Sequence, residues 1–320
     1  MTDRCATAAG ESHLKRVRRS PARHFVTAAL AAALVAVTGS SRAEPAPNEG
    51  DHRIVWDYPR FRPWEYTASI GVLGTAVYIE SVAKDFSPVN NWHGILFDDA
   101  VRNAFHSSDA DTRNRVAKIS DYMWNATQYY PVLIDSLLVP IVFDKGNIDV
   151  ASQMLLIDLQ VESLSFFLVR VGARAIGRDR PSVQECANNP DYDGVCHIKN
   201  SAYASFFSGH AIMSFSGAAL TCAHHAALPL YGSSFLGSLA CAMTMTSATV
   251  VAGMRIVADK HWATDVLIGS GLGLGLGLGL PYVLHYGPQL KVDKGPHPVS
   301  LAMMPMVATD ALGLSVVGMQ

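Results

Sequence analysis

The chain has 320 residues, enough for one large domain with a sizeable core or for two small ones. Hydrophobic residues make up 49% and charged residues only 16%, which is apolar for a soluble protein but does not by itself define a membrane protein. The formal net charge is −2, and no basic cluster follows the N-terminal region, so we expect no nucleic-acid partner.

Residues 1–43 have the pattern of a signal peptide for export. A basic region precedes an apolar run from Phe25 to Val37, and Ser41 and Ala43 place small residues at the cleavage positions. The run of about 13 residues is short for a membrane span, although an uncleaved N-terminal anchor is the alternative. Without this segment, which holds seven basic and two acidic side chains, 18 basic and 25 acidic residues would remain, a formal charge of −7. We therefore expect an exported, periplasmic protein.

Four cysteines lie outside the predicted signal peptide. Cys186 and Cys196 bracket a short polar loop, and in an exported protein we expect this pair to form a disulfide that contributes about 2–3 kcal/mol. Cys222 and Cys241 lie in apolar segments and are expected to be buried thiols.

The remainder of the chain predicts an all-α protein with six core helices, because its apolar segments have helical length and little β-type alternation. The core helices are expected at 64–82, 121–143 (interrupted near Pro131 and Pro140), 149–175, 203–228, 233–252 and 262–285. A surface helix is expected within 92–121. Residues 44–63 are Pro-rich and predict a linker or a loosely docked arm.

The helical domain is thus expected to span residues 64–290, followed by a tail at 291–320. The tail predicts irregular structure or a short β-hairpin, in which Pro305 would confine its strand to an edge.

Charged residues interrupt the apolar pattern of the third core helix. Asp158, Glu162 and Arg170 would be expensive against lipid, so at least one face of this helix must be wet or paired. His224 and His225, on the fourth core helix, lack metal-binding spacing and are expected to form a polar patch or a helix terminus without partners.

Residues 269–279 read GSGLGLGLGLG. A dinucleotide-binding loop requires a preceding strand and a third glycine at the position of Leu274. The run continues directly from the segment before it, and residues 266–285 contain no Asp, Glu, Lys or Arg. We therefore expect a Gly-rich helix that approaches its neighbour closely, although each glycine costs about 1 kcal/mol relative to alanine.

Three motifs carry the candidate chemistry. Residues 177–182 read GRDRPS after the third helix, and residues 207–211 read FSGHA where the fourth helix begins. Arg255, His261 and Asp265 follow the spacing Arg-x5-His-x3-Asp between the fifth and sixth helices. In a helix His261 and Asp265 would lie on one face, where a carboxylate can fix the tautomer of the imidazole.

This order of motifs resembles the type 2 phosphatidic acid phosphatase superfamily, which includes lipid phosphatases, bacterial class A non-specific acid phosphatases and vanadium haloperoxidases. The family pattern is Lys-x6-Arg-Pro, then Pro-Ser-Gly-His, then Ser-Arg-x5-His-x3-Asp, and the resemblance covers roughly residues 120–285. It implies a six-helix bundle of the phosphatase and haloperoxidase type. It also implies a metal-independent phosphatase without a cofactor, similar to the exported bacterial acid phosphatases, that hydrolyses phosphate monoesters or lipid phosphates through a phosphohistidine.

The resemblance also assigns roles to single residues. His261 matches the nucleophile, His210 the general acid and base, and Asp265 the group that orients His261. Arg180 and Arg255 match the two phosphate-binding arginines. The remaining donors of the phosphate site are expected to be the hydroxyl of Ser208 and the backbone N–H of Gly209.

The chain departs from the family pattern at three positions. Ala173 stands in place of the lysine, where Arg174 or Arg170 is available to replace the charge, Phe207 in place of a proline and Met254 in place of a serine. Loss of one donor of this kind typically costs about 100-fold to 1,000-fold in rate. A catalytically weak phosphate-binding membrane protein is therefore one alternative function, and a vanadate-dependent haloperoxidase on the same site is another.

Two questions of placement stay open at this point. The six apolar helices fit an integral membrane protein whose site faces the periplasm as well as an exported domain that associates with the membrane. Trp262, Phe206 and Phe207 flank the site residues, where they fit either an apolar entrance for a lipid tail or core packing.

Overall fold

The computed structural model describes residues 53–82, 93–192, 196, 202–287, 300–308 and 311–319. The predicted signal peptide and residues 44–52 of the predicted linker lie outside the described residues.

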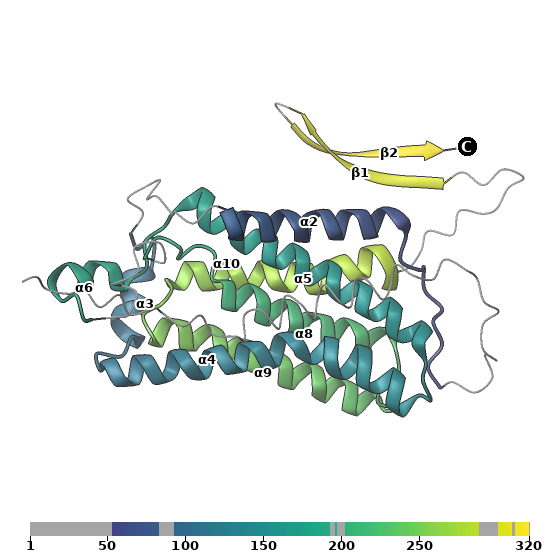
Figure 1. Ribbon diagram of the computed structural model, residues 1–320, viewed down its shortest axis with the longest axis horizontal. Helices are drawn as coiled ribbons and strands as arrows, with labels where there is room; N and C mark the ends of the chain where they lie inside the picture. The colour runs from purple at the N-terminus through teal and green to yellow at the C-terminus, as the bar shows by residue number, and fades with distance from the viewer. Residues whose placement is uncertain are drawn as a thin grey trace, which may run out of the picture. The chain divides into compact units, whose positions relative to one another are not determined.

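The described part of the chain contains a helical bundle arranged around one central helix, α8 (Figure 1). Its α-helices are α2 (Pro63–Val82), α3 (Asp98–Phe105), α4 (Ala110–Tyr130), α5 (Ile148–Ile176), α6 (Ser182–Asn188), α8 (Gly209–Ala227), α9 (Ser234–Val257) and α10 (Ala263–Leu274). Three π-helical stretches are η1 (Pro131–Phe143), η3 (Gly275–Gly279) and η4 (Tyr282–Tyr286). Helices α4, α5, α9 and α10 each pack against α8, and α2 packs against α5.

The six expected core helices are present as α2, α4 with η1, α5, α8, α9, and α10 with η3 and η4. The expected surface helix at 92–121 is two helices, α3 and the beginning of α4. The all-α prediction is therefore confirmed for the bundle.

Local chemistry explains where several of these helices change or end. The interruption near Pro131 and Pro140 is a π-helical stretch, because a proline has no N–H to donate to the α-helical hydrogen-bond ladder. Helix α5 starts where the side chain of Asn147 accepts a hydrogen bond from the N–H of Val150, at 3.2 Å. It ends at Gly177, whose φ of 59° lies in the left-handed region, and this turn leads the chain into the first motif.

Residues 53–62 are part of the core rather than the loosely docked arm that their proline content predicted. The side chains of Ile54, Trp56 and Phe61 are buried. The backbone N–H groups of Arg53 and Ile54 donate to the carboxylate of Asp144 at 2.7 and 3.1 Å. The apolar side chains between the prolines decided the outcome, because their burial holds the segment against the bundle.

The Gly-rich segment is helical, as predicted, and lies against α8. A Cβ atom at Gly273 would meet the carbonyl oxygen of Ile212, and one at Gly277 would meet the carbonyl oxygen of Ser216. Both neighbours belong to α8, so these glycines allow the two backbones to approach closely.

Asp158 and Glu162 of α5 have partners inside the bundle, in line with the prediction that at least one face of this helix is wet or paired. Asp158 is bonded to Nε2 of His224 at 2.8 Å, and Glu162 accepts a hydrogen bond of 3.0 Å from a glutamine of α4. His224 and His225 lie in the last turn of α8, which confirms the predicted helix terminus, but the expectation that they lack partners is wrong. Both are buried, and His225 lies 3.3 Å from Asp135, so the polar pattern of α8 reflects interior carboxylates that sequence spacing does not reveal.

Both cysteine pairs are disulfides. The predicted bond between Cys186 and Cys196 is present. The prediction that Cys222 and Cys241 are free thiols is wrong, because α8 and α9 pack side by side and bring the two Cα atoms to 4.6 Å. Apolar surroundings predict burial, but they do not indicate whether two buried cysteines face each other.

Residues near the C-terminus form two strands, β1 (Ser300–Ala308) and β2 (Ala311–Met319). They pair antiparallel, with Ser300 opposite Met319 and Ala308 opposite Ala311.

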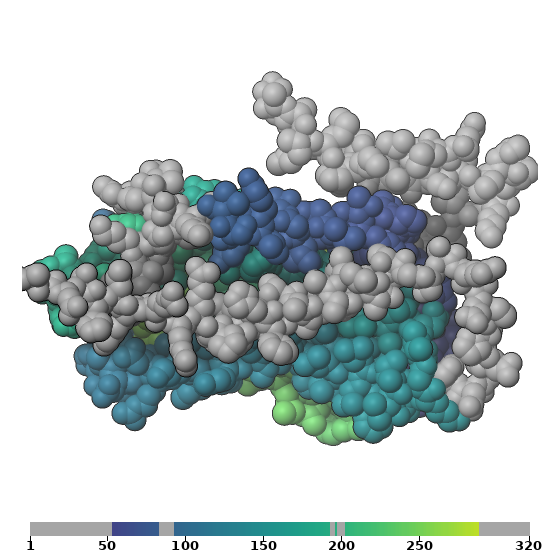
Figure 2. All heavy atoms as spheres, viewed as in Figure 1, coloured from purple at the N-terminus to yellow at the C-terminus, as the bar shows by residue number. Residues whose placement is uncertain are grey.

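Several helices of the bundle present large apolar side chains on their outer faces. Helical segments Ala110–Phe143, Ser234–Val257 and Ala263–Tyr286 are long and apolar enough to cross a membrane. Helix α2 lies exposed along the face shown in Figure 2. The most exposed apolar side chains of these four segments include Trp64, Tyr78, Val82, Leu133, Val142, Phe143, Phe235, Met243, Leu267 and Val283. Together with the two disulfides, these helices indicate a membrane or extracytoplasmic location.

We predict that the full chain stays in the membrane pellet after an alkaline carbonate wash, because its apolar outer faces would otherwise contact water. The measurement is an immunoblot of pellet and supernatant, with a peripheral membrane protein as the control that the wash releases. Release of this chain together with the peripheral marker would contradict an integral placement.

Candidate active site

The three sequence motifs meet at one end of the bundle. The C-terminal ends of α5 and α9 and the N-terminal ends of α8 and α10 lie there, next to α3 and α6 (Figure 1). Two backbone hydrogen bonds join the motifs directly. The N–H of Ser208 donates to the carbonyl of Asp265 at 3.3 Å, and the N–H of Ser205 donates to the carbonyl of Arg178 at 3.1 Å.

Arg178 is the fully buried cation that connects these segments. Its Nη1 donates to Asp265 at 2.5 Å and to the hydroxyl of Thr264 at 2.8 Å, and its Nη2 donates to Asp98 at 2.6 Å. Arg178 belongs to the first motif, but the motif pattern predicted no role for it. Its position two residues before Arg180 contains no signal that distinguishes a structural arginine from a phosphate-binding one.

His261 is buried, and its hydrogen bond defines its tautomer. Nδ1 lies 2.8 Å from the carbonyl oxygen of Ser205. A carbonyl can only accept, so Nδ1 carries the proton and Nε2 of the neutral ring has the lone pair. Burial lowers the pKa of His261 well below its usual value, and the positive charges of Arg180 and Arg255 lower it further. The ring is therefore neutral at physiological pH, as a nucleophile must be.

Asp265 is close to His261 but is not its hydrogen-bond partner. Its Oδ2 lies 3.9 Å from Nδ1 of His261, and it accepts instead from the hydroxyl of Ser205 and the N–H of Trp262. Asp265 therefore holds the loop whose carbonyl orients His261. Asp265 thus acts on the ring of His261 only through the backbone carbonyl of Ser205. Ser205 lies outside the three motifs, so their spacing did not predict this contact.

His210 lies in the first turn of α8 and contacts a carboxylate of α4. Its Nε2 is bonded to Oδ1 of Asp121 at 2.7 Å, and its ring packs against Trp124, with ring centroids 4.7 Å apart. Burial and the charge of Arg255 lower the pKa of His210 to about 4, while the hydrogen bond to Asp121 acts in the opposite direction. Asp121 and Trp124 lie 86 or more residues from His210 in the sequence, and nothing in the motifs predicted either contact.

Both predicted phosphate-binding arginines lie close enough to His261 for their charges to lower its pKa. Nη1 of Arg255 donates to the hydroxyl of Ser120 at 2.9 Å and to Asp121 at 3.1 Å. Nη1 of Arg180 donates to the carbonyl of Lys260 at 3.1 Å. These hydrogen bonds fix the two guanidinium groups beside His261, where they create a positive field suited to an anion.

Ser208 and Gly209 form the N-terminus of α8. Ser208 caps the helix, because its hydroxyl accepts a hydrogen bond of 3.4 Å from the N–H of Ala211. The hydroxyl proton stays available to a further acceptor. The N-terminus of a helix of 19 residues also favours an anion through its dipole and its N–H groups.

Arg174, the predicted replacement for the missing lysine, turns towards α2. Its Nη2 lies 3.6 Å from Glu80, and Nη1 of Arg170 lies 3.0 Å from the same carboxylate. Ala173 is buried on a different face of α5. The structure thus brings Arg174 together with Arg170 and Glu80, a pairing with α2 that the spacing of the first motif did not predict.

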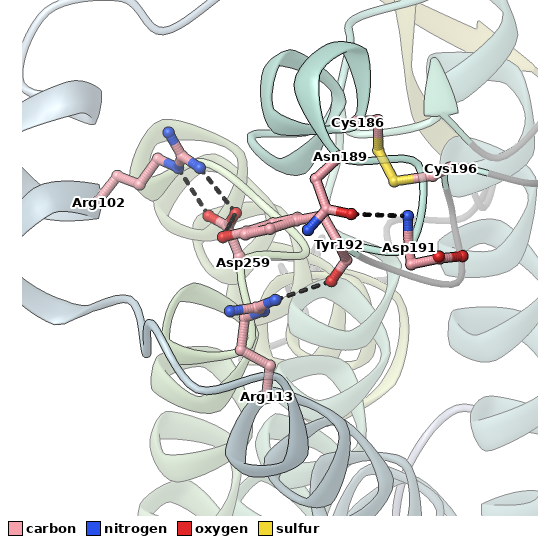
Figure 3. The surroundings of a disulfide bond; sticks show 8 residues. All are labelled: Arg102, Arg113, Cys186, Asn189, Asp191, Tyr192, Cys196 and Asp259. Atoms are coloured by element: carbon pink, nitrogen blue, oxygen red, sulfur yellow. Dashed lines mark hydrogen bonds and ion pairs between the residues drawn. A yellow bond between two sulfur atoms is a disulfide. The ribbon is translucent and has the colours of Figure 1, made fainter.

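The loop that follows Arg180 is attached to the third motif through the surroundings of the disulfide (Figure 3). Arg102 of α3 donates to Asp259 at 2.8 and 2.9 Å, and Asp259 also accepts from the hydroxyl of Tyr192 at 3.1 Å. Arg113 of α4 donates to the carbonyl of Tyr192 and lies over its ring. The Cys186–Cys196 bond therefore closes a loop that is held from both α3 and α4.

Of the three aromatic residues beside the motifs, Trp262 serves core packing. Trp262 is buried, and its Nε1–H donates to the carbonyl of Asp179 at 2.8 Å, so it does not line an entrance. Phe206 and Phe207 are half-buried, and a Cβ atom at Gly172 would collide with the ring of Phe207.

Among the described residues, no group of three or more His, Cys, Asp or Glu side chains could hold a metal ion. The donors at this end of the bundle are two histidines, two arginines and a helix N-terminus, a set suited to a tetrahedral oxyanion.

This set of donors at one end of an all-α bundle suits the binding of an anion. Residues 159–288, a stretch that includes all three motifs, match the model of the PAP2 superfamily. This superfamily has activities of the phosphatase or haloperoxidase type, and its members are generally phosphatases that act on phosphate esters. No curated protein and no solved structure matches the chain.

We predict that Arg178→Met lowers the free energy of unfolding by about 3–5 kcal/mol, because it leaves Asp98 and Asp265 buried without their cation. Chemical denaturation in detergent measures the change. Arg60→Met is the matched control, since Arg60 pairs with Asp149 on the surface and its loss should cost less than about 1 kcal/mol. Equal costs for the two variants would show that the buried network does not hold this end of the bundle together.

Proposed function

We propose that the protein is a metal-independent phosphatase that hydrolyses phosphate monoesters, including lipid phosphates, through a phosphohistidine on His261. His210 is the general acid and base, and Asp265 positions His261 through Ser205. Arg180, Arg255, Ser208 and Gly209 bind the phosphate.

The observation that carries the proposal is the protonation state that the fold imposes on His261. The carbonyl of Ser205 accepts a hydrogen bond from Nδ1–H, so the lone pair on Nε2 is available to attack phosphorus. Burial and two arginine charges keep the ring neutral. A histidine that only served packing would not need two cations beside it.

The proposed reaction has two steps. The Nε2 lone pair forms a bond to phosphorus, while the bond from phosphorus to the ester oxygen breaks and the oxygen takes a proton from His210. Water then attacks the phosphorus atom of the phosphohistidine and gives a proton to His210. The bond between phosphorus and Nε2 breaks, so that phosphate is released and His261 is free again. The arginines and the N-terminus of α8 stabilise the charge on the phosphoryl oxygens in both steps.

The outer surface of the bundle supports lipid phosphates among the substrates. Its three candidate spans would hold the site at one end of a membrane-embedded bundle, where the phosphate group of a lipid reaches the water interface. Two disulfides favour an extracytoplasmic site, because such bonds persist in oxidising compartments.

We predict that His261→Ala abolishes both turnover and the phosphoenzyme, because it removes the attacking nitrogen. His210→Ala should instead accumulate phosphoenzyme, since without the base its hydrolysis slows by about 100-fold to 10,000-fold. Acid-sensitive radiolabel retained on the quenched protein measures both effects. His106→Ala is the control outside the site, and its turnover should match the wild type. Normal turnover by His261→Ala would end the assignment of the nucleophile.

The pKa shifts predict an activity that falls as pH rises. His210 must be protonated to act as an acid, and its pKa of about 4 in the free protein places the alkaline limb of kcat/KM in the acid range. His261 must be neutral, and because burial and the two arginine charges lower its pKa well below its usual value, its own titration limits activity only at acidic pH. A bound phosphate dianion should raise the pKa of His210, so the limb of kcat lies at higher pH than that of kcat/KM. A rate that is flat between about pH 4 and 8 would contradict a two-histidine mechanism.

A further inference from the structure

One oxygen atom of Asp121 is bound by two donors that the proposed reaction needs. Oδ1 lies 2.7 Å from Nε2 of His210 and 3.1 Å from Nη1 of Arg255. This oxygen marks the point where the general acid and a phosphate-binding arginine converge. In the proposed reaction the ester oxygen must lie within hydrogen-bonding reach of His210, on a phosphorus atom that Arg255 holds. The carboxylate of Asp121 therefore occupies the place of the leaving oxygen.

Three other carboxylates near the site are held by different cations. Asp265 and Asp98 are bonded to Arg178, and Asp259 is bonded to Arg102. The negative charge of each is therefore neutralised by an arginine that does not belong to the proposed phosphate site. Asp121 is compensated by the donors of the site itself.

The side chain of Asp121 has room to move, whereas the side chains of His210 and Arg255 do not. It is 53% exposed, whereas the side chains of His210 and Arg255 are 19% and 6% exposed. Asp121 can thus rotate into solvent without a change in helix packing, while the two donors keep their positions.

We propose that Asp121 is a tethered anion that fills the leaving-oxygen position of the empty site and makes the site selective for monophosphate esters over diphosphates. This inference rests on the proposed function. A phosphate monoester displaces the carboxylate from His210 and Arg255, but the short side chain keeps its negative charge beside the leaving oxygen. In a diphosphate that oxygen carries a second phosphate group, which the nearby carboxylate repels. An uncharged alcohol, such as the glycerol portion of a lipid phosphate, meets no such repulsion.

The test is equilibrium binding of inorganic phosphate and of pyrophosphate, measured by titration calorimetry on the full chain in detergent. Asp121→Asn removes the charge and keeps the shape. We expect it to bind phosphate about fivefold to tenfold more tightly than the wild type, and to gain a further tenfold or more for pyrophosphate. Asp111→Asn is the matched control, because Asp111 is exposed on the same helix and has no contact with His210 or Arg255 among the described hydrogen bonds and ion pairs. It should leave both affinities unchanged.

Three results would overturn the proposal. Phosphate binding by Asp121→Asn that is no tighter than that of the wild type, in a protein with an unchanged melting temperature, would show that Asp121 only orients His210. Equal gains for phosphate and pyrophosphate would remove the selectivity, and a similar gain in Asp111→Asn would reveal a general charge effect. The radiolabel on His261 reports the proposed function independently, so failure of the anion test and failure of the phosphatase assignment are distinguishable.

Discussion

The buried ion network of Arg178 is the interaction on which the site depends. One guanidinium joins Asp98 of α3 to Asp265 of α10, and the carbonyl of the same residue accepts from Ser205. A buried arginine between two carboxylates is costly to desolvate, and breaking such a network costs more than forming it returns. The main effect of this network is therefore to fix three distant segments relative to one another. Its contribution to net stability is smaller.

The orientation of His261 follows from this constraint. Arg178 and Asp265 hold Ser205, and the carbonyl of Ser205 holds the Nδ1 proton of His261. Because the carboxylate of Asp265 is already compensated by Arg178, the charges that act on His261 are mainly those of Arg180 and Arg255. In the same network, the charge of Arg178 holds the loop, whereas the charges of Arg180 and Arg255 act on His261.

The sequence predicted the six helices and the Gly-rich contact, because apolar periodicity carries that information, and the three motifs that it singled out meet at one end of the bundle. It did not predict the partners of those residues. Asp121 and Ser205 lie far from His210 and His261 in the chain, and only packing brings them into contact. The Cys222–Cys241 bond was missed for the same reason, since its formation depends on the relative rotation of α8 and α9. Proline content misled the interpretation of residues 53–62, where the buried apolar side chains decided the outcome.

The central claim is that one particular nitrogen becomes covalently attached to phosphorus. Its most direct test is to quench the wild-type protein during turnover of a phosphate monoester, digest it under conditions that preserve phosphohistidine, and locate the phosphoryl group by mass spectrometry. The structure predicts a single modified residue, His261, with the phosphoryl group on Nε2, because Nδ1 is bonded to the carbonyl of Ser205. A phosphoryl group on His210 or Ser208, or turnover with no covalent intermediate, would contradict the account.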